Sequence, residues 1–252
     1  MIHNFRQRLK QGDLLLGTLV SLNSPEVVEL LAAAGFDWLF LDAEHAPLEW
    51  SGLQAMLQAA GRHVACIIRV PALDEAAIKH ALDLGAVGII VPQVHTAEQA
   101  ALAVQWARFP PGGTRGMGIA RAHGYGFQIS EYNQQANEQT VVVVQAESAE
   151  AVRNIDAIVQ TPGLDAVLIG PADLSASLGH PGDFAHPDLH EAIARITRAC
   201  QAAAMPLGIF ALTVEAARPY IAQGYGLMVI SLDTYLLGQA ARELLRAVKN
   251  LT

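Results

Sequence analysis

Residues 141–147 read Val-Val-Val-Val-Gln-Ala-Glu, an apolar run without alternation that ends in polar side chains. Three other apolar runs end in a similar way, at Asp42, at Arg69 and shortly before Asp173. Continuous β-branched and Leu-rich runs are typical of parallel strands that are buried on both faces. Since the carboxyl ends of parallel barrel strands lie at one rim, these polar residues are predicted to share one functional rim.

A second pattern joins these runs into repeating units. A helical stretch, a glycine and an apolar run follow one another at Gly35, Gly85, Gly163 and Gly224. A glycine just past a helix accepts the left-handed conformation that turns the chain into the next strand. Strands are predicted at residues 14–20, 38–41, 65–69, 88–91, 141–145, 166–169, 206–210 and 227–231. Eight such units predict an α/β fold, a TIM-type (β/α)8 barrel formed by one domain over residues 1–252.

The intervening helices have recognisable starts. Ser24 followed by Pro25 predicts one helix start, and Asp74 followed by Glu75 predicts another. A doubly wound open sheet is the competing architecture, but no Gly-x-Gly-x-x-Gly follows the first strand. The stretch from about 109 to 137 begins too rich in Gly and Pro for an ordinary crossover, so we expect a long loop that serves as a lid or contact.

The composition restricts the partners. The formal net charge is −8 and no cluster of Lys and Arg occurs, which argues against nucleic acid. Hydrophobic residues make up 52% of the chain and charged residues 16%, so we expect apolar surface to be buried in a homo-oligomer. No apolar run is long enough to cross a membrane, and no apolar segment of a signal peptide follows the basic N-terminus. These features predict a cytoplasmic protein that binds small molecules and copies of itself.

Two acids are candidates for a metal site. Glu147 and Asp173 follow neighbouring predicted strands, and each offers oxygen to a hard divalent cation. Mg²⁺ or Mn²⁺ suits such ligands better than Zn²⁺, and the remaining positions would take water and a bidentate 2-oxo acid. Alternatively, either acid caps the helix that follows it. Their occurrence as a pair on one rim favours the metal.

Three more residues are candidates for catalysis. His45 follows Asp42 closely beyond a strand, so Asp42 is predicted to orient the imidazole for proton transfer. Arg69 ends an apolar strand, where its charge needs an anion such as a substrate carboxylate or a developing enolate. The alternative for Arg69 is a buried pairing with Asp42 or Glu44.

Lysine usage narrows the mechanism. The chain contains only Lys10, Lys79 and Lys249, and none ends a predicted strand, where a Schiff-base nucleophile would have to lie. No Ser or Cys has the sequence context of a nucleophile elbow. The residues therefore favour metal-assisted acid–base chemistry.

At these residues the chain resembles the HpcH/HpaI aldolases, class II metal-dependent pyruvate aldolases that include 4-hydroxy-2-oxoheptane-1,7-dioate and 2-dehydro-3-deoxyglucarate aldolases. The matching segments are Leu41-Asp-Ala-Glu-His-Ala-Pro47, Arg69-Val-Pro71, Gly88-Ile-Ile-Val-Pro-Gln93, Phe109-Pro-Pro-Gly-Gly-Thr-Arg-Gly116, Gln145-Ala-Glu147 and Gly170-Pro-Ala-Asp-Leu-Ser175. They span most of the chain and are specific when taken together.

The resemblance implies a barrel that exchanges its last helix between partners and assembles as a homohexamer. It implies a divalent ion on Glu147 and Asp173, Mg²⁺ or Mn²⁺, with Co²⁺ as a further option. Pyruvate would chelate this ion through its keto and carboxylate oxygens. Gln145 and the backbone of Ala172 and Asp173 would lie nearby as substrate-binding groups.

The resemblance also implies roles in the reaction, which would be reversible cleavage of a 4-hydroxy-2-oxo acid to pyruvate, or a close 2-oxo acid, and an aldehyde. Arg69 would bind substrate and stabilise the enolate oxygen. His45, oriented by Asp42, would move the proton of the hydroxyl or aldehyde oxygen through water. This is electrostatic stabilisation of an enolate, which a metal and Arg69 can supply together.

One departure from the family leaves the aldehyde open. Relatives that cleave dicarboxylates have a Trp after the first Gly, where this chain has Thr18 after Gly17. Two alternatives to the aldolase remain: a related lyase acting on an acyl-CoA ester or phosphoenolpyruvate, and a catalytically silent barrel. Fold alone does not exclude the silent barrel.

Overall fold

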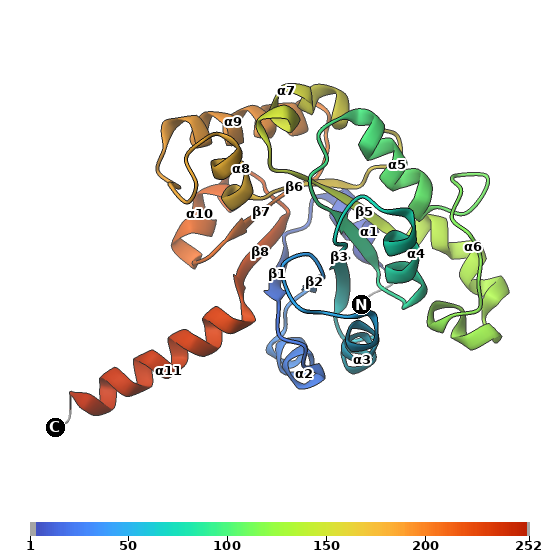
Figure 1. Ribbon diagram of the computed structural model, residues 1–252, viewed down its shortest axis with the longest axis horizontal. Helices are drawn as coiled ribbons and strands as arrows, with labels where there is room; N and C mark the ends of the chain where they lie inside the picture. Colours follow the sequence, from blue (N-terminus) through green and yellow to red (C-terminus); the bar gives the residue numbers. More distant parts are fainter. Residues whose placement is uncertain (1–3, 251–252) are drawn as a thin grey trace.

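The computed structural model describes residues 4–250, which form a closed barrel surrounded by helices (Figure 1). All eight strands are parallel, neighbours in sequence are neighbours in the barrel, and the last strand pairs with the first. The strands are β1 (Leu15–Val20), β2 (Trp38–Asp42), β3 (Ala65–Arg69), β4 (Gly88–Val91), β5 (Val141–Ala146), β6 (Ala166–Ile169), β7 (Leu207–Ala211) and β8 (Leu227–Leu232). The predicted (β/α)8 barrel is confirmed, with small shifts at strand ends.

A helix precedes the first strand, and helices follow each of the strands; most of them cover the outside of the barrel. They are α1 (Phe5–Gln11), α2 (Pro25–Ala34), α3 (Trp50–Ala60), α4 (Glu75–Asp83), α5 (Ala97–Ala107), α6 (Ile129–Gln139), α7 (Ala149–Ile158), α8 (Pro171–Ser177), α9 (Pro187–Ala202), α10 (Val214–Ala222) and α11 (Asp233–Lys249). A 3₁₀ helix, η2, spans Arg121–Gly126.

The helix boundaries confirm the capping predictions. The side chains of Ser24 and Asp74 accept hydrogen bonds from the backbone N–H of Val27 and Ala77, at the starts of α2 and α4. The four glycines that were predicted to leave a helix in the left-handed conformation do so, with φ between 85° and 95°. Local signals therefore determine where these units turn.

Side chains fill the barrel interior, and α1 closes its amino end. Trp38, at the start of β2, lies so close to Gly17 that a Cβ at position 17 would be 2.4 Å from the indole. Phe5 and Leu9 of α1 are buried in the same cluster, and the Phe5 ring centroid lies 6.3 Å from that of Trp38. Substrate access is therefore confined to the carboxyl end of the barrel.

The stretch that was predicted to be a long loop contains helical structure. It begins as irregular chain after α5, and then η2 and α6 follow before β5. The expectation of an unbroken loop was wrong because the Gly and Pro residues are concentrated in its first part, around Pro111 and Gly113. Its last part, Ile129–Gln139, contains no Gly or Pro and forms helix α6.

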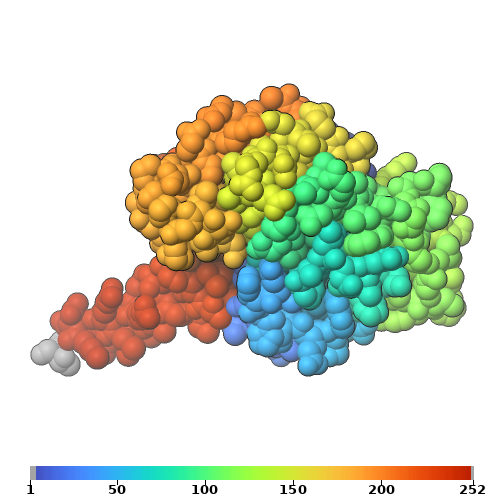
Figure 2. Space-filling model, turned by 45° about the horizontal axis from the view of Figure 1, so that its top comes forward, coloured from blue at the N-terminus to red at the C-terminus, as the bar shows by residue number. Residues whose placement is uncertain are grey.

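The last helix projects away from the barrel (Figures 1 and 2). Asp233 is its buried residue, whereas Leu237, Leu244 and Leu245 are each more than half exposed. An amphipathic helix with an uncovered apolar face agrees with the expected exchange between partners, which stays a prediction. Among the described residues, no helix is long and apolar enough to cross a membrane.

Candidate active site

The predicted site residues meet at the carboxyl end of the barrel. Asp42 and Arg69 end β2 and β3 and lie opposite each other in the register of these strands. Gln145 lies in β5, and Glu147 directly follows that strand. Asp173 lies in the first turn of α8, just after β6. The barrel thus brings together residues that are far apart in sequence.

Asp42 and Arg69 form a buried bidentate pair. Arg69 Nε donates to Asp42 Oδ1 at 2.9 Å and Nη2 donates to Oδ2 at 2.7 Å. Burial opposes the charge of Asp42, but the hydrogen bonds and charge of Arg69 outweigh it and lower the carboxyl pKa. The same carboxylate accepts from the backbone N–H groups of Glu44 and His45. Asp42 therefore fixes Arg69 and the turn after β2.

The structure differs from the sequence interpretation at His45. The Asp42 carboxylate contacts the His45 backbone, whereas the imidazole is 60% exposed and its Nε2 lies 3.7 Å from Glu44 Oε2. Asp42 positions the turn that carries His45, so its influence on the imidazole is through the backbone.

Arg69 connects the Asp42 carboxylate with a second set of polar groups. Its Nη1 donates to Gln145 Oε1 at 3.3 Å and lies 3.1 Å from Glu44 Oε2. The guanidinium also lies over the Phe40 ring, 5.1 Å from the centroid. The pairing that was the alternative for Arg69 is therefore present, with Nη1 facing the middle of the site.

Glu147 is the most buried acid of the site, with 2% of its surface exposed. Its oxygens accept hydrogen bonds from the Gln145 side chain at 2.6 Å and from the Gln93 backbone N–H at 2.8 Å. Burial raises its pKa to about 7, the Gln93 bond opposes this, and the charges of Asp173 and Glu44 add to it. The charge of Arg69 acts in the opposite direction, but the hydrogen-bond donors of Glu147 are neutral groups, so its charge is only partly compensated.

The two acids differ in how they relate to the helices that follow them. The cap of α7 is Ser148, whose side chain accepts from the Ala151 N–H, and the cap residue of α8 is Gly170. Glu147 therefore does not cap α7, whereas Asp173 lies in the first turn of α8, where a carboxylate is favourable. Carboxylate oxygens at a site with excess negative charge are the donors that a hard divalent cation prefers, so the residues fit such an ion.

Two residues of the site, Gln93 and Gly170, were not predicted from the sequence, and Glu44 was named only as an alternative partner of Arg69. Gln93 adopts a left-handed backbone conformation, φ 53°, which directs its N–H at Glu147. At Gly170 an added Cβ would lie 2.4 Å from Glu147 Oε2. Glu44 is partly buried, and burial raises its carboxyl pKa against the opposing charge of Arg69. Both Gln93 and Gly170 lie in matching family segments, which was the available signal.

Ala172 has an exposed side chain and a hydrogen-bonded backbone carbonyl. It is exposed at the start of α8, and its carbonyl accepts a hydrogen bond from the Ser175 hydroxyl at 2.7 Å. The backbone before Asp173 is thus held in place by its own helix turn.

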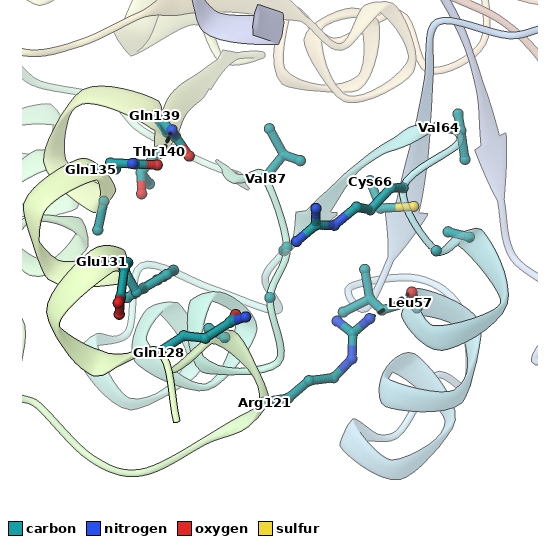
Figure 3. Close-up of a pocket in the computed structure, with 18 of the residues that line it drawn as sticks. Leu57, Val64, Cys66, Val87, Arg121, Gln128, Glu131, Gln135, Gln139 and Thr140 are labelled. Atoms are coloured by element: carbon teal, nitrogen blue, oxygen red, sulfur yellow. Dashed lines mark hydrogen bonds between the residues drawn. The ribbon is translucent and has the colours of Figure 1, made fainter. Parts of the chain in front are cut away.

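A cavity of about 670 Å³ lies elsewhere, between the end of α3, the starts of β3 and β4, and α6 (Figure 3). Arg121 enters it and donates to the carbonyl oxygens of Leu84 and Leu57 at 2.7 and 3.1 Å. None of the predicted site residues, all of which the structure describes, lines this cavity. The candidate site is therefore defined by its side chains at the open carboxyl end.

Comparison with known proteins identifies the relatives of this chain. The model of the HpcH/HpaI aldolase/citrate lyase family matches residues 16–240. A 4-hydroxy-2-oxovalerate aldolase of Rhodococcus jostii is 42% identical over 94% of this chain and 93% of its own length. A 2-dehydro-3,6-dideoxy-6-sulfogluconate aldolase of Pseudomonas putida is 41% identical over 96% and 95%.

A solved structure agrees with these sequence relatives. The crystal structure of an HpcH/HpaI aldolase/citrate lyase family protein from Burkholderia cenocepacia superposes with a TM-score of 0.95 at 41% identity, covering 98% of this chain and 99% of the other. The resemblance noted in the sequence is thereby confirmed. This chain belongs to the HpcH/HpaI aldolase/citrate lyase family and is a carbon–carbon lyase of the aldolase type.

Proposed function

We propose that this enzyme is a metal-dependent class II aldolase that reversibly cleaves a 4-hydroxy-2-oxo acid into pyruvate, or a close 2-oxo acid, and an aldehyde. The environment of Glu147 supports this proposal most. This carboxylate is buried, its hydrogen-bond donors are neutral, and its pKa is raised to about 7. Such a group calls for a cation, and Asp173 supplies a second oxygen ligand beside it.

Glu147 and Asp173 are the proposed ligands of the divalent ion, Mg²⁺ or Mn²⁺, with Co²⁺ as a further option. When bound, this ion would polarise the 2-oxo group and attract the negative charge that develops on its oxygen. Gln145 would hold Glu147 in place through its 2.6 Å hydrogen bond and bind substrate from the same side. Ala172 and Asp173 would contribute backbone contacts at the start of α8.

Arg69 would stabilise the enolate of the 2-oxo acid. Its bidentate pairing with Asp42 keeps the guanidinium in one orientation, and Nη1 faces Gln145 and the centre of the site. A donor that is oriented before the reaction loses little energy to reorganisation, which is the basis of electrostatic catalysis. Asp42 is thus proposed as the positioning residue for Arg69.

His45 is proposed to move the proton between the substrate hydroxyl and solvent. Its exposed imidazole, on the turn after β2, can reach both substrate and water. Glu44, 3.7 Å from Nε2, lies where it would stabilise the protonated ring. Cleavage of the carbon–carbon bond then needs the hydroxyl proton to leave through His45.

The names of two relatives support the substrate class. Both describe 2-oxo acids that keep a hydroxyl on carbon 4 and carry none on carbon 3. Cleavage between these carbons leaves a pyruvate unit and an aldehyde. We infer the same bond for this enzyme, whereas the aldehyde end is the part that differs between the two relatives.

The assembly that we propose is a homohexamer of single-domain chains in the cytoplasm. The uncovered apolar face of α11 supports exchange of this helix between partners. Size-exclusion chromatography with light scattering would measure the assembly. Removal of residues from 234 onward should then reduce the number of subunits in the assembly.

The test of the reaction is deuterium exchange into the pyruvate methyl group, followed by NMR in metal-free enzyme and after addition of Mg²⁺ or Mn²⁺. We expect exchange that depends on the metal, because enolate formation is the step the metal serves. Exchange that is absent with every metal would contradict the proposal and favour the acyl-CoA or phosphoenolpyruvate lyase, or the silent barrel.

A His45→Ala variant separates the proton steps. We expect aldol cleavage to slow by about 10²- to 10⁴-fold, the usual contribution of general acid–base catalysis, while methyl exchange stays close to wild type. An equal loss in both assays would instead make His45 the base that removes the methyl proton.

A further inference from the structure

A cluster of two histidines and one aspartate lies outside the catalytic residues. His180 lies in the segment between α8 and α9, and His186 and Asp188 lie at the start of α9. One ligand atom from each of the three side chains lies within 4.8 Å of the others. Figure 1 shows α8 and α9 at the edge of the barrel, and all three side chains are partly exposed to solvent.

The distances within this cluster suit a small transition metal ion. His180 Nε2 lies 3.1 Å from Asp188 Oδ2, and His186 Nδ1 lies 3.7 Å from the same oxygen. Ligand atoms bound tetrahedrally at about 2.0–2.1 Å from zinc lie roughly 3.3 Å from one another. Both of these distances are close to that value.

The ring arrangement shows which side chains would have to move to share an ion. The imidazoles of His180 and His186 are stacked, with centroids 3.4 Å apart and planes at 16°. An imidazole binds a metal through a lone pair in the plane of its ring, so one of the two stacked rings would have to turn for both to face one ion. The Asp188 backbone N–H donates to His186 Nδ1 at 3.2 Å, and a bound ion would replace this hydrogen bond.

Hydrogen bonds hold the segment that carries His180. The His180 N–H donates to the Ser175 carbonyl at 2.8 Å, and the Gly182 N–H donates to the Ser175 hydroxyl at 3.0 Å. The His186 N–H donates to the Asp183 carbonyl at 3.3 Å. A segment ordered in this way lowers the entropy that metal binding would cost.

We infer that His180, His186 and Asp188 form a second metal site, which binds a transition metal of the Zn²⁺ class with water completing the coordination. Imidazole ligands favour such ions, whereas Mg²⁺ and Mn²⁺ favour the carboxylates at the barrel end. The positive end of the α9 dipole opposes a cation here. Asp188, in the first turn of that helix, supplies the charge that offsets it.

The experiment is calorimetric titration of Zn²⁺ into tag-free, metal-stripped, full-length enzyme carrying Glu147→Gln, so that the carboxyl-end acids do not contribute. We expect one Zn²⁺ to bind per chain. The His180→Gln variant should bind Zn²⁺ with an affinity at least ~10-fold lower. The matched control is His190→Gln, which removes an exposed imidazole from the next turn of α9. This control should keep the affinity.

Binding of Co²⁺ gives an independent readout through the visible absorption of a tetrahedral site, which His180→Gln should abolish. If circular dichroism shows that His180→Gln is misfolded, Asp188→Asn replaces it and should weaken Zn²⁺ binding similarly. Equal Zn²⁺ affinity in the parent, the ligand variants and His190→Gln would overturn the inference, because it indicates adventitious binding only. Displacement of the bound Zn²⁺ by millimolar Mg²⁺ would overturn it as well.

Discussion

Two buried carboxylates lie at opposite ends of the barrel and have opposite surroundings. Asp165, just before β6, is 1% exposed and lies 2.7 Å from Arg6 Nε, 2.9 Å from Arg108 Nη2 and 3.5 Å from Lys10 Nζ. Glu147, just after β5, is 2% exposed and accepts its hydrogen bonds from an amide side chain and a backbone N–H. The two carboxylates are about equally buried, so they differ mainly in how far nearby cations compensate their charge.

This difference separates a structural end from a functional end. Desolvation of a carboxylate is unfavourable, and at Asp165 three cations offset it and join α1 to β6 and to the chain after α5. At Glu147 the Gln93 hydrogen bond and the charge of Arg69 offset this cost only in part, and burial raises the carboxyl pKa to about 7. An incompletely compensated buried charge lowers the stability of the folded protein and is retained where a ligand uses it.

The largest expected effect is loss of activity at the functional end. Glu147→Gln should lower kcat/KM by at least ~10³-fold, because a charged metal ligand becomes a neutral amide. The free energy of unfolding should stay within about 1 kcal/mol of wild type, since the group that is replaced is a buried charge with only partial compensation. Steady-state kinetics with Mg²⁺ and urea unfolding of the metal-free protein check both parts. Full activity would remove Glu147 from the metal site.

The reverse change is expected at the structural end. Asp165→Asn should lower the free energy of unfolding by roughly 3–5 kcal/mol, because Arg6 and Arg108 lose the charge that compensates them. The kcat of the folded enzyme should remain near wild type. Asp156→Asn, which breaks an exposed pair with Arg195, serves as the control and should change stability little. A stable Asp165→Asn protein would contradict the comparison.

Crowding at the functional end gives a third prediction. Gly170→Ala should lower activity by about 10²-fold, because its Cβ would lie 2.4 Å from Glu147 Oε2 and 3.1 Å from Gln145 Nε2. Gly118→Ala, where an added Cβ meets no atom within 4 Å, is the matched control. Kinetics of both variants at equal metal concentration test this. Equal rates would mean that the Glu147 side chain has room to move.

The smallest expected effect sharpens the account of the structural end. Lys10 is half exposed and is the most distant of the three cations around Asp165. Lys10→Gln should therefore lower the free energy of unfolding by less than about 1 kcal/mol, as for other exposed pairs. A loss as large as that of Asp165→Asn would mean that Lys10 supplies most of the compensation.

Much of the fold was predictable because its signals are local. The apolar runs, the caps at Ser24 and Asp74 and the glycines that end helices each depend on a few adjacent residues. The helix α6 was missed because the Gly and Pro residues upstream dominated the interpretation of the whole stretch. The site residues themselves were also named in advance, since polar side chains at the ends of buried strands are uncommon.

The sequence by itself determined the barrel, its family and the residue types at its carboxyl rim, because periodicity and motifs are properties of adjacent positions. Only the tertiary structure decided which of those residues touch. It paired Asp42 with Arg69 rather than with the His45 ring, and it placed the Gln93 N–H on Glu147. Such contacts depend on strand register and burial, which decide whether a buried carboxylate forms direct ion pairs, as Asp165 does, or accepts its hydrogen bonds from neutral groups, as Glu147 does.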